Sequence, residues 1–478
     1  MPNLEIEPHA EQKVSLVVCS NSQGLELRGS LLRLTRYLAV FEVYNPLVVL
    51  RLSEVLGDFK IIINDRAIYS GRAVVGGLIN AGTVVVCEVR LDEEGFCIAS
   101  FSPANGEPHL RAGFGDFLEQ WQSVYRVLPE FKVVVADMQT FLMDLRLWLD
   151  QVELEIRSAP TGDRTEMEAE AVRELADAFV PAFDAMHERL ESISESIETE
   201  LRPVHQNFSK RQLHALVMCS PFAYRTYYKP LGYAGDYEMV NMIMRDPYEG
   251  SSLFAKAVNL WFLSQWPARA HRNRIRYLRE CLRQESLRGA RRGQPIRVLN
   301  LGCGPACEVQ EFLAEDPLSD HAQFTLLDFN EETIQHARRT LEELRKRFGR
   351  RTVLQLQRKS VHQVLKEGAR AAATPHAAYD FIYCAGLFDY LPDRTCKQLM
   401  NIFYDWLAPG GLLAATNVDN CRPFRHMLEF VLDWHLIYRD TRKSSALLPD
   451  AAGPDLGRIQ RDLTGVNVII EARKAEHG

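Results

Sequence analysis

A glycine turn at residues 298–306 and the acid Asp328 are the strongest chemical features of the sequence. The run Val-Leu-Asn-Leu-Gly-Cys-Gly-Pro-Ala joins an apolar strand pattern to a helix pattern. Such a turn lets the backbone approach a ligand closely, and the helix that follows offers its N-terminus. Asp328 ends the next apolar run, 28 residues after Asn300, where a carboxylate can accept hydrogen bonds from ribose hydroxyls. Asp328 also suits a helix N-cap, so both roles are open.

Two later segments are expected to border the same ligand. Ser360 and Val361 follow a third apolar run, and Cys384-Ala385-Gly386 ends a fourth, before a polar and aromatic loop. Each position also suits an ordinary strand-to-helix turn. The predicted ligand-contacting residues are Asn300, Gly302, Gly304, Pro305, Ala306, Glu308, Asp328, Phe329, Asn330, Ser360, Val361, Cys384, Ala385 and Gly386.

The elements that must position these residues alternate between strand and helix patterns over residues 291–478. Alternation of this kind predicts a doubly wound parallel sheet. The order of the landmarks resembles the class I S-adenosylmethionine (SAM) methyltransferases, which implies a Rossmann-like α/β domain with SAM as cofactor. Two positions depart from that family: Asn300 stands where an acid is usual, and Ala306 where a third glycine is usual.

Residues 113–290 have a helical pattern, interrupted by a loop at 220–243 that is rich in tyrosine and glycine. Its sequence KPLGYAGDYEM, together with the later GCGPACEV, AGLFDYL and DWHLIYR, resembles the bacterial synthases of 3-hydroxy fatty acid methyl esters. The resemblance implies methylation of a fatty acid carboxylate to a quorum-sensing signal. We expect the loop to act as a lid over the cofactor or the acceptor.

A carboxylate is already a nucleophile at neutral pH, so its methylation needs alignment more than a strong base. Lys229, Arg272, Arg274 and Arg439 are candidate anchors for an acid, although a solvated helix face also explains Arg272 and Arg274. The residues predicted to act in catalysis are Tyr233, Asp236, Asp389, Tyr390 and Arg439.

Residues 1–112 contain short β-type runs with Gly, Asn and Asp between them, which predicts a small β-barrel. The segment RGSLLRLTRYLAVFEVYNPLVVLRLSEVL resembles PilZ-type barrels, which implies binding of cyclic di-GMP. Arg28, Arg33 and Arg36 lack the usual spacing, and the Asp and Gly of the PilZ turn are missing. We therefore expect a degenerate PilZ-like domain that binds a protein partner or no ligand.

The whole chain of 478 residues has a net charge of -7 and 46% hydrophobic residues, which favours a globular protein and argues against nucleic acid as a partner. It has no apolar run long enough for a membrane span, no signal-peptide pattern and no CxxC pair, so we expect a cytoplasmic protein without a metal. The long helices suggest a homodimer. Two functions follow: a SAM-dependent methyltransferase, or a regulatory protein with a nucleotide- or partner-binding barrel and a weakened SAM fold.

Overall fold

The computed structural model describes residues 15–43, 50–63, 66–80, 85–96, 118, 126–160, 162–371, 379–453 and 456–476. By its internal contacts the chain forms two compact units. Unit 1 contains Met1–Leu50 and Glu54–Gln120, and unit 2 contains Arg51–Ser53 and Trp121–Gly478. No helix in the described part of the chain combines the length and apolarity of a membrane span.

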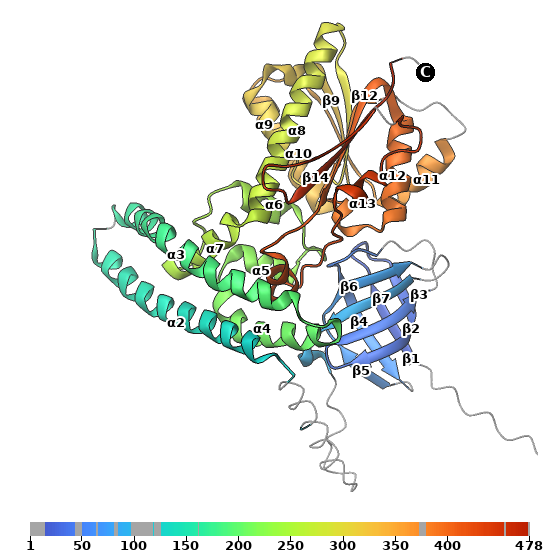
Figure 1. Cartoon of the computed structure of the whole chain (residues 1–478). Helices are drawn as coiled ribbons and strands as arrows, with labels where there is room; N and C mark the ends of the chain where they lie inside the picture. Colours follow the sequence, from blue (N-terminus) through green and yellow to red (C-terminus); the bar gives the residue numbers. More distant parts are fainter. Residues whose placement is uncertain are drawn as a thin grey trace, which may run out of the picture. The chain divides into compact units, whose positions relative to one another are not determined.

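Unit 1 is a closed antiparallel barrel (Figure 1). Its strands are β1 (Ser15–Ser20), β2 (Glu26–Thr35), β3 (Leu38–Val43), β4 (Val55–Ile63), β5 (Arg66–Ser70), β6 (Ala73–Asn80) and β7 (Val85–Leu91), followed by a short 3-10 turn, η1 (Glu93–Gly95). Pairing of β1 with β4 closes the ring, and β5 extends it as a hairpin on β4. Every second residue of β7 is buried, as the alternation in the sequence predicts. The predicted barrel is confirmed, whereas the expectation that it binds a protein partner or no ligand stays a prediction.

The first part of unit 2 is helical, as predicted, but the predicted loop at 220–243 is mostly helical, and its longest stretch between helices is residues 229–236. Its elements are α2 (Pro129–Ser158), α3 (Arg164–Glu195), η3 (Thr199–Leu201), α4 (Arg202–Val217), α5 (Pro221–Tyr228), α6 (Tyr237–Met244), α7 (Leu253–Ser264) and α8 (Trp266–Arg291). Phe131, Phe183 and Trp261 are fully buried in one apolar cluster that α2, α3 and α7 share. Helix α2 leaves Leu147 and Leu154 exposed, and a homodimer through these helices stays a prediction.

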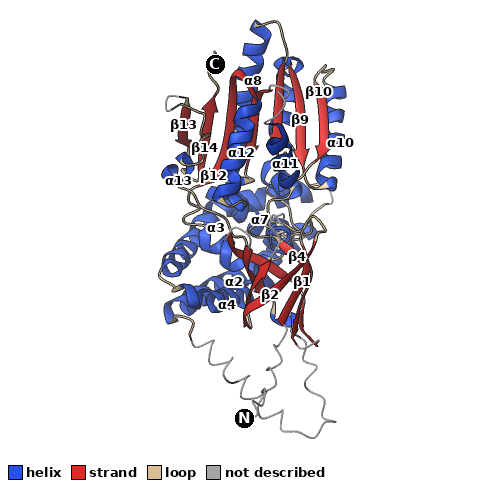
Figure 2. Cartoon of the chain, turned by 90° about the vertical axis from the view of Figure 1, so that its right-hand side faces the viewer, coloured by secondary structure: helices blue, strands red, loops and turns tan. Residues whose placement is uncertain are grey.

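The second part of unit 2 is a seven-stranded sheet with the order β10-β9-β8-β11-β12-β14-β13 (Figure 2). The strands are β8 (Ile296–Leu301), β9 (Ala322–Asp328), β10 (Val353–Arg358), β11 (Tyr379–Ala385), β12 (Leu407–Val418), β13 (Gly457–Arg461) and β14 (Asn467–Arg473). The helices are α9 (Cys307–Glu315), η4 (Pro317–His321), α10 (Glu331–Arg347), α11 (Val361–Ala371), η5 (Phe388–Tyr390), α12 (Asp393–Trp406), the π-turn η6 (Met427–Val431) and α13 (Thr441–Ser445). Helices α8, α9 and α10 lie on one side of the sheet, and α11 and α12 lie on the other (Figure 1).

The sheet differs from the expected parallel sheet at one edge. Strands β8 to β12 are parallel, but β14 pairs antiparallel with both β12 and β13. The connection from β13 to β14 is only residues 462–466, and a loop this short can join only antiparallel neighbours. Strand β13 (GRIQR) is polar and half-exposed, so the sequence has no apolar pattern that would predict this strand.

A buried carboxylate fastens helix α3 to the segment that follows β12. Glu191 accepts hydrogen bonds from the backbone N–H of His426 (3.0 Å), the ring Nδ1 of His426 (2.9 Å) and the backbone N–H of Met427 (2.8 Å). Burial by itself raises the pKa of Glu191, but hydrogen bonds from His187 and His426 outweigh it and lower this pKa to about 2. The contact holds in place a segment, residues 421–431, whose apolar residues belong to the main core of the helical region.

Glu191→Gln is expected to lower the free energy of unfolding near neutral pH. The folded pKa lies below the ordinary value of 4.5, so the ionised group stabilises the fold above that pH and loses this effect as the pH falls toward 2. Urea unfolding at about pH 7 and about pH 3.5 measures both the loss and the pH dependence. The exposed Glu188 on the same helix supplies the control, Glu188→Gln. An unchanged pH dependence in Glu191→Gln would contradict the assignment.

Candidate active site

The turn after β8 has the left-handed backbone that its glycines permit. Gly302 has φ +74° and Gly304 has φ +52°, and Ala306 follows with φ +55°. The N–H groups of Gly302 and Cys303 donate to the carbonyl oxygen of Leu327 at 2.8 and 3.0 Å, which ties the turn to the end of β9. A left-handed Ala costs about 1–2 kcal/mol relative to Gly, so the turn keeps the shape of the motif despite losing its third glycine.

Asp328 lies at the carboxyl end of β9 and joins the two loops there. Its Oδ2 accepts the N–H of Gly304 at 3.2 Å, and its Oδ1 accepts the N–H of Asn330 at 3.0 Å. Burial raises the pKa of Asp328, and these hydrogen bonds oppose the rise. The N-cap of α10 is Asn330, which accepts from Thr333, so the alternative role of Asp328 as the cap is wrong. Arg51 of the same unit lies over the neighbouring Phe329 ring, 4.0 Å from its centroid.

Asn300, Glu308 and Tyr383 form a buried polar cluster beside the turn. Glu308 Oε1 accepts from Tyr383 Oη at 2.7 Å and from Asn300 Nδ2 at 3.3 Å. Within the described residues, the buried Asn300 Oδ1 has no hydrogen-bond partner. An acceptor without a partner next to a carboxylate suits a cationic amine, because a buried acceptor left unpaired is costly. Sequence reasoning missed Tyr383, which the apolar β11 pattern conceals.

These features line one pocket, whose volume is about 1590 Å³ including the part open to solvent. The predicted ligand-contacting residues in its lining are Asn300, Gly302, Gly304, Pro305, Ala306, Glu308, Asp328, Phe329, Val361, Ala385 and Gly386. Asn330, Ser360 and Cys384 lie beside the lining. Asn330 caps α10, the hydroxyl of Ser360 accepts from Gln363 at the start of α11, and Cys384 is buried in β11.

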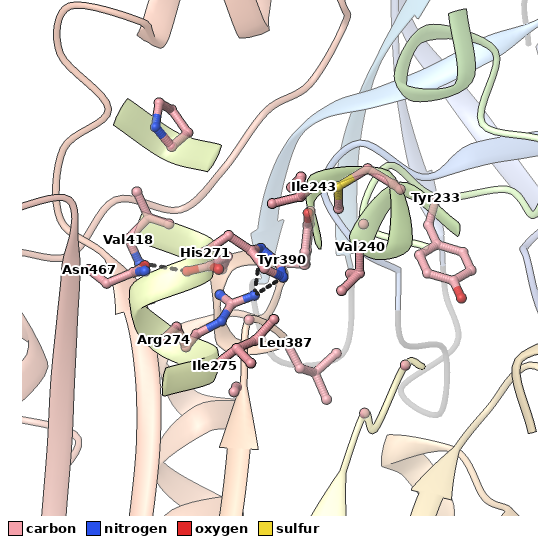
Figure 3. Close-up of a pocket in the computed structure, with 18 of the residues that line it drawn as sticks. Tyr233, Val240, Ile243, His271, Arg274, Ile275, Leu387, Tyr390, Val418 and Asn467 are labelled. Carbon is pink, nitrogen blue, oxygen red and sulfur yellow. Dashed lines mark hydrogen bonds between the residues drawn. The ribbon is translucent and has the colours of Figure 1, made fainter. Parts of the chain in front are cut away.

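The pocket continues away from the glycine turn between apolar side chains. Figure 3 shows Val240 and Ile243 of α6 facing Ile275 of α8 and Leu387 across it. Phe222, Phe262, Phe424, Leu428, Trp434 and Leu436 extend the apolar lining. The helical region and the segment after β12 therefore build an apolar chamber. This chamber adjoins the polar cradle, which comprises the glycine turn at 298–306, Asp328 and the cluster of Asn300, Glu308 and Tyr383.

The loop at 229–239 lies against the start of α10. The Tyr233 hydroxyl is 3.4 Å from Thr333 Oγ1, and its ring centroid is 5.0 Å from that of Phe329. Asp236 caps α6 by accepting from Met239, and it pairs with Arg225 at 2.8 Å. Tyr233 lines the pocket and Asp236 does not, so the structure gives Asp236 the position of a residue that holds the loop.

The loop after β11 contributes Asp389 and Tyr390 to the lining. Asp389 accepts the backbone N–H of Val418 at 2.7 Å, and burial raises its pKa to about 6, against the opposing effect of Arg274. Tyr390 accepts from Trp434 Nε1 at 3.0 Å. The predicted catalytic residues Tyr233, Asp389 and Tyr390 are thus brought to one chamber.

Three of the four candidate anchors bind protein oxygens. Lys229 donates to the carbonyl of Leu432 and Arg272 to those of Ile243 and Leu263. Arg439 is buried and lies outside the lining, where it donates to the carbonyls of two loop residues and pairs with a carboxylate. Arg274 lines the pocket.

Part of this unit resembles a known protein family. Residues 299–413 match the family model of a methyltransferase domain. The matched segment runs from β8 into β12 and contains the glycine turn, Asp328 and Gly386. A methyltransferase domain of this kind implies SAM as the cofactor. The glycine cradle, the buried Asp328 and the unpaired Asn300 Oδ1 fit a ligand that carries both a ribose and an ammonium group.

Searches of other known proteins give only distant similarity. No curated protein matches the sequence. Among solved structures, a possible exported protein from Bordetella parapertussis is 17% identical, with 63% of this chain and 97% of that chain covered and a TM-score of 0.39. The magnesium protoporphyrin IX methyltransferase from Synechocystis PCC 6803 with bound SAH is 12% identical, with 53% and 98% covered and a TM-score of 0.35.

Proposed function

We propose that the protein is an O-methyltransferase that transfers the methyl group of SAM to the carboxylate of a 3-hydroxy fatty acid or a similar lipid-like acid. The observation that carries the proposal is the single pocket in which the polar cradle adjoins an apolar chamber. The chamber offers a fatty acid chain the apolar contacts that favour its transfer from water.

Different residues of the cradle bind different parts of the cofactor. Asp328 is placed to accept hydrogen bonds from the ribose hydroxyls. Asn300 Oδ1 and Glu308 are placed to accept from the ammonium group. When bound, SAM would supply an electrophilic methyl group on its sulfonium, and transfer of that methyl to the carboxylate oxygen would release S-adenosylhomocysteine (SAH).

The acceptor side needs no proton transfer, because a carboxylic acid is already ionised at neutral pH. The protein therefore has to align the acid and exclude water. The side chains of Tyr233 and Leu387 and the backbone at Gly386 line the pocket, and Leu387 lies beside Gly302 of the glycine turn. Positioning of this kind accounts for catalysis without a general base.

The proposal can be tested in cells by growing a strain that expresses this protein on trideuteromethyl methionine. We expect lipid extracts to contain fatty acid methyl esters that carry the heavy methyl group, and to lack them when the strain expresses Asp328→Asn. Mass spectrometry measures both. Label in other lipids or small molecules, with none in methyl esters, would contradict the proposed acceptor while leaving methyl transfer intact.

A further inference from the structure

Arg274 differs from the other cations around the pocket in what it contacts. Arg274 lies on α8 and lines the pocket beside Gly386. A side chain at position 386 would be too close to it, because a Cβ on Gly386 would lie 3.0 Å from both Nη1 and Nη2 of Arg274. Its Nη2 donates to the ring of His271, 2.9 Å from Nδ1. Within the described part of the chain, Arg274 forms no ion pair with a carboxylate.

A positive charge that is partly shielded from water and has no carboxylate partner is energetically costly unless an anion binds to it. Burial lowers the pKa of Arg274, and the more distant charge of Asp389 opposes that shift. An arginine remains protonated in any protein environment, so the positive charge persists. The position thus holds a permanent cation in the wall of the pocket.

The neighbouring His271 does not add a second charge. Burial lowers its pKa well below 6.5, and the charges of Arg274 and Arg272 lower it further. A neutral ring accepts a hydrogen bond from the guanidinium and fixes its direction. Figure 3 shows His271 and Tyr390 next to Arg274, with Val240 and Ile243 across the chamber.

The location of Arg274 defines what it can bind. Gly386 follows the carboxyl end of β11, and ligands of open α/β sheets bind outside the carboxyl ends of the strands. The apolar residues Val240 and Ile243 lie across the chamber from Arg274, and Leu387 lies between Gly386 and the glycine turn at Gly302. An acid with an apolar tail fits this arrangement, with its charge at Arg274 and its tail between the apolar side chains.

We propose that Arg274 is the anion anchor of the methyl acceptor: it pairs with the acidic group and selects an anionic acceptor over a neutral one of the same length. This inference rests on the proposed function, since it assumes that the chamber holds the acceptor. Gly386 leaves room for the guanidinium, and His271 positions it.

Titration of octanoate and of octanamide into the SAH complex tests the anchor. The two probes share a tail and differ in charge. Arg274→Gln is expected to weaken octanoate binding about 10- to 100-fold, the usual effect of losing a charge-assisted hydrogen bond, and to leave octanamide unchanged. Arg274→Lys keeps the charge without the planar fork and is expected to retain part of the affinity.

Arg276→Gln is the matched control, because Arg276 is exposed on the same helix and donates to Asn273. The affinity for SAH, measured in each variant, reports whether the cradle is intact. Equal octanoate binding by the wild type and Arg274→Gln would overturn the anchor, as would a parallel loss of octanamide binding. A wild-type protein that binds octanamide as tightly as octanoate would overturn it as well.

The same variants separate the anchor from the proposed function. Octanoate binding that depends on Arg274, without formation of any methyl ester, would leave the anchor in place and contradict the proposed function. Methyl ester formation that is undiminished in both Arg274→Gln and Arg274→Lys would support the function and overturn the anchor.

Discussion

Asp328→Asn is expected to weaken the binding of SAM and SAH by at least about 100-fold. Each hydrogen bond to a charged acceptor contributes about 1.5–3 kcal/mol, and a ribose presents two hydroxyls to this carboxylate. The amide keeps the size of the side chain and one oxygen, so the contacts to Gly304 and Asn330 are perturbed less than an alanine would perturb them. Isothermal titration with SAH measures the loss directly.

Asp380→Asn provides the control for that experiment. Asp380 lies near the start of β11, at the end of the strand far from Gly386. There it pairs with Arg292 and accepts a hydrogen bond from the N–H of Arg297. Its variant is expected to bind SAH as the wild type does. SAH affinity that is equal in Asp328→Asn and in the wild type would remove Asp328 from the cofactor site.

Arg439→Met is expected to lower the free energy of unfolding by about 2–6 kcal/mol, about 1–3 kcal/mol for each of the two carbonyl oxygens that lose the buried donor. The guanidinium donates to the carbonyls of Phe388 (2.8 Å) and Leu391 (2.6 Å) and to Asp393 (2.8 Å). These bonds hold the loop that carries Asp389 and Tyr390, so loss of methyl transfer should accompany the loss of stability. Urea unfolding followed by circular dichroism measures the change.

Arg442→Met is the control for Arg439, since Arg442 is exposed on the neighbouring α13. The sequence predicts a catalytic role for Arg439, whereas its contacts indicate a structural role, and these two roles give different results. A variant that unfolds at the wild-type urea concentration but turns over no substrate would favour the catalytic role. A variant that is destabilised with an unchanged KM at low temperature would favour the structural one.

The cofactor cradle could be predicted from sequence because its parts are local. A strand, a glycine turn and a helix are contiguous at residues 296–315, and the spacing to Asp328 follows from this helix and the next strand. The barrel was predictable for the same reason, since its strands alternate in burial and follow one another closely.

The acceptor side could not be predicted to the same depth, because distant segments build it. Arg274 belongs to a helix rich in arginine, where a solvated face was an equally good interpretation until the fold placed Gly386 against it. The glycine and aromatic residues around Asp236 suggested a catalytic role, yet Asp236 caps helix α6 and pairs with Arg225. Tyr383 is hidden in an apolar strand, and only the pairing with Glu308 reveals its polar contact.

The most direct test of the central claim is the transfer of a radioactive methyl group from SAM to 3-hydroxypalmitate by the purified protein. Methyl esters are cleaved by mild base, which releases the label as volatile methanol. We predict label in the lipid phase that base treatment releases, with none in the Asp328→Asn protein. No label in the lipid phase, or label that resists base, from a protein that binds SAH would contradict carboxylate methylation.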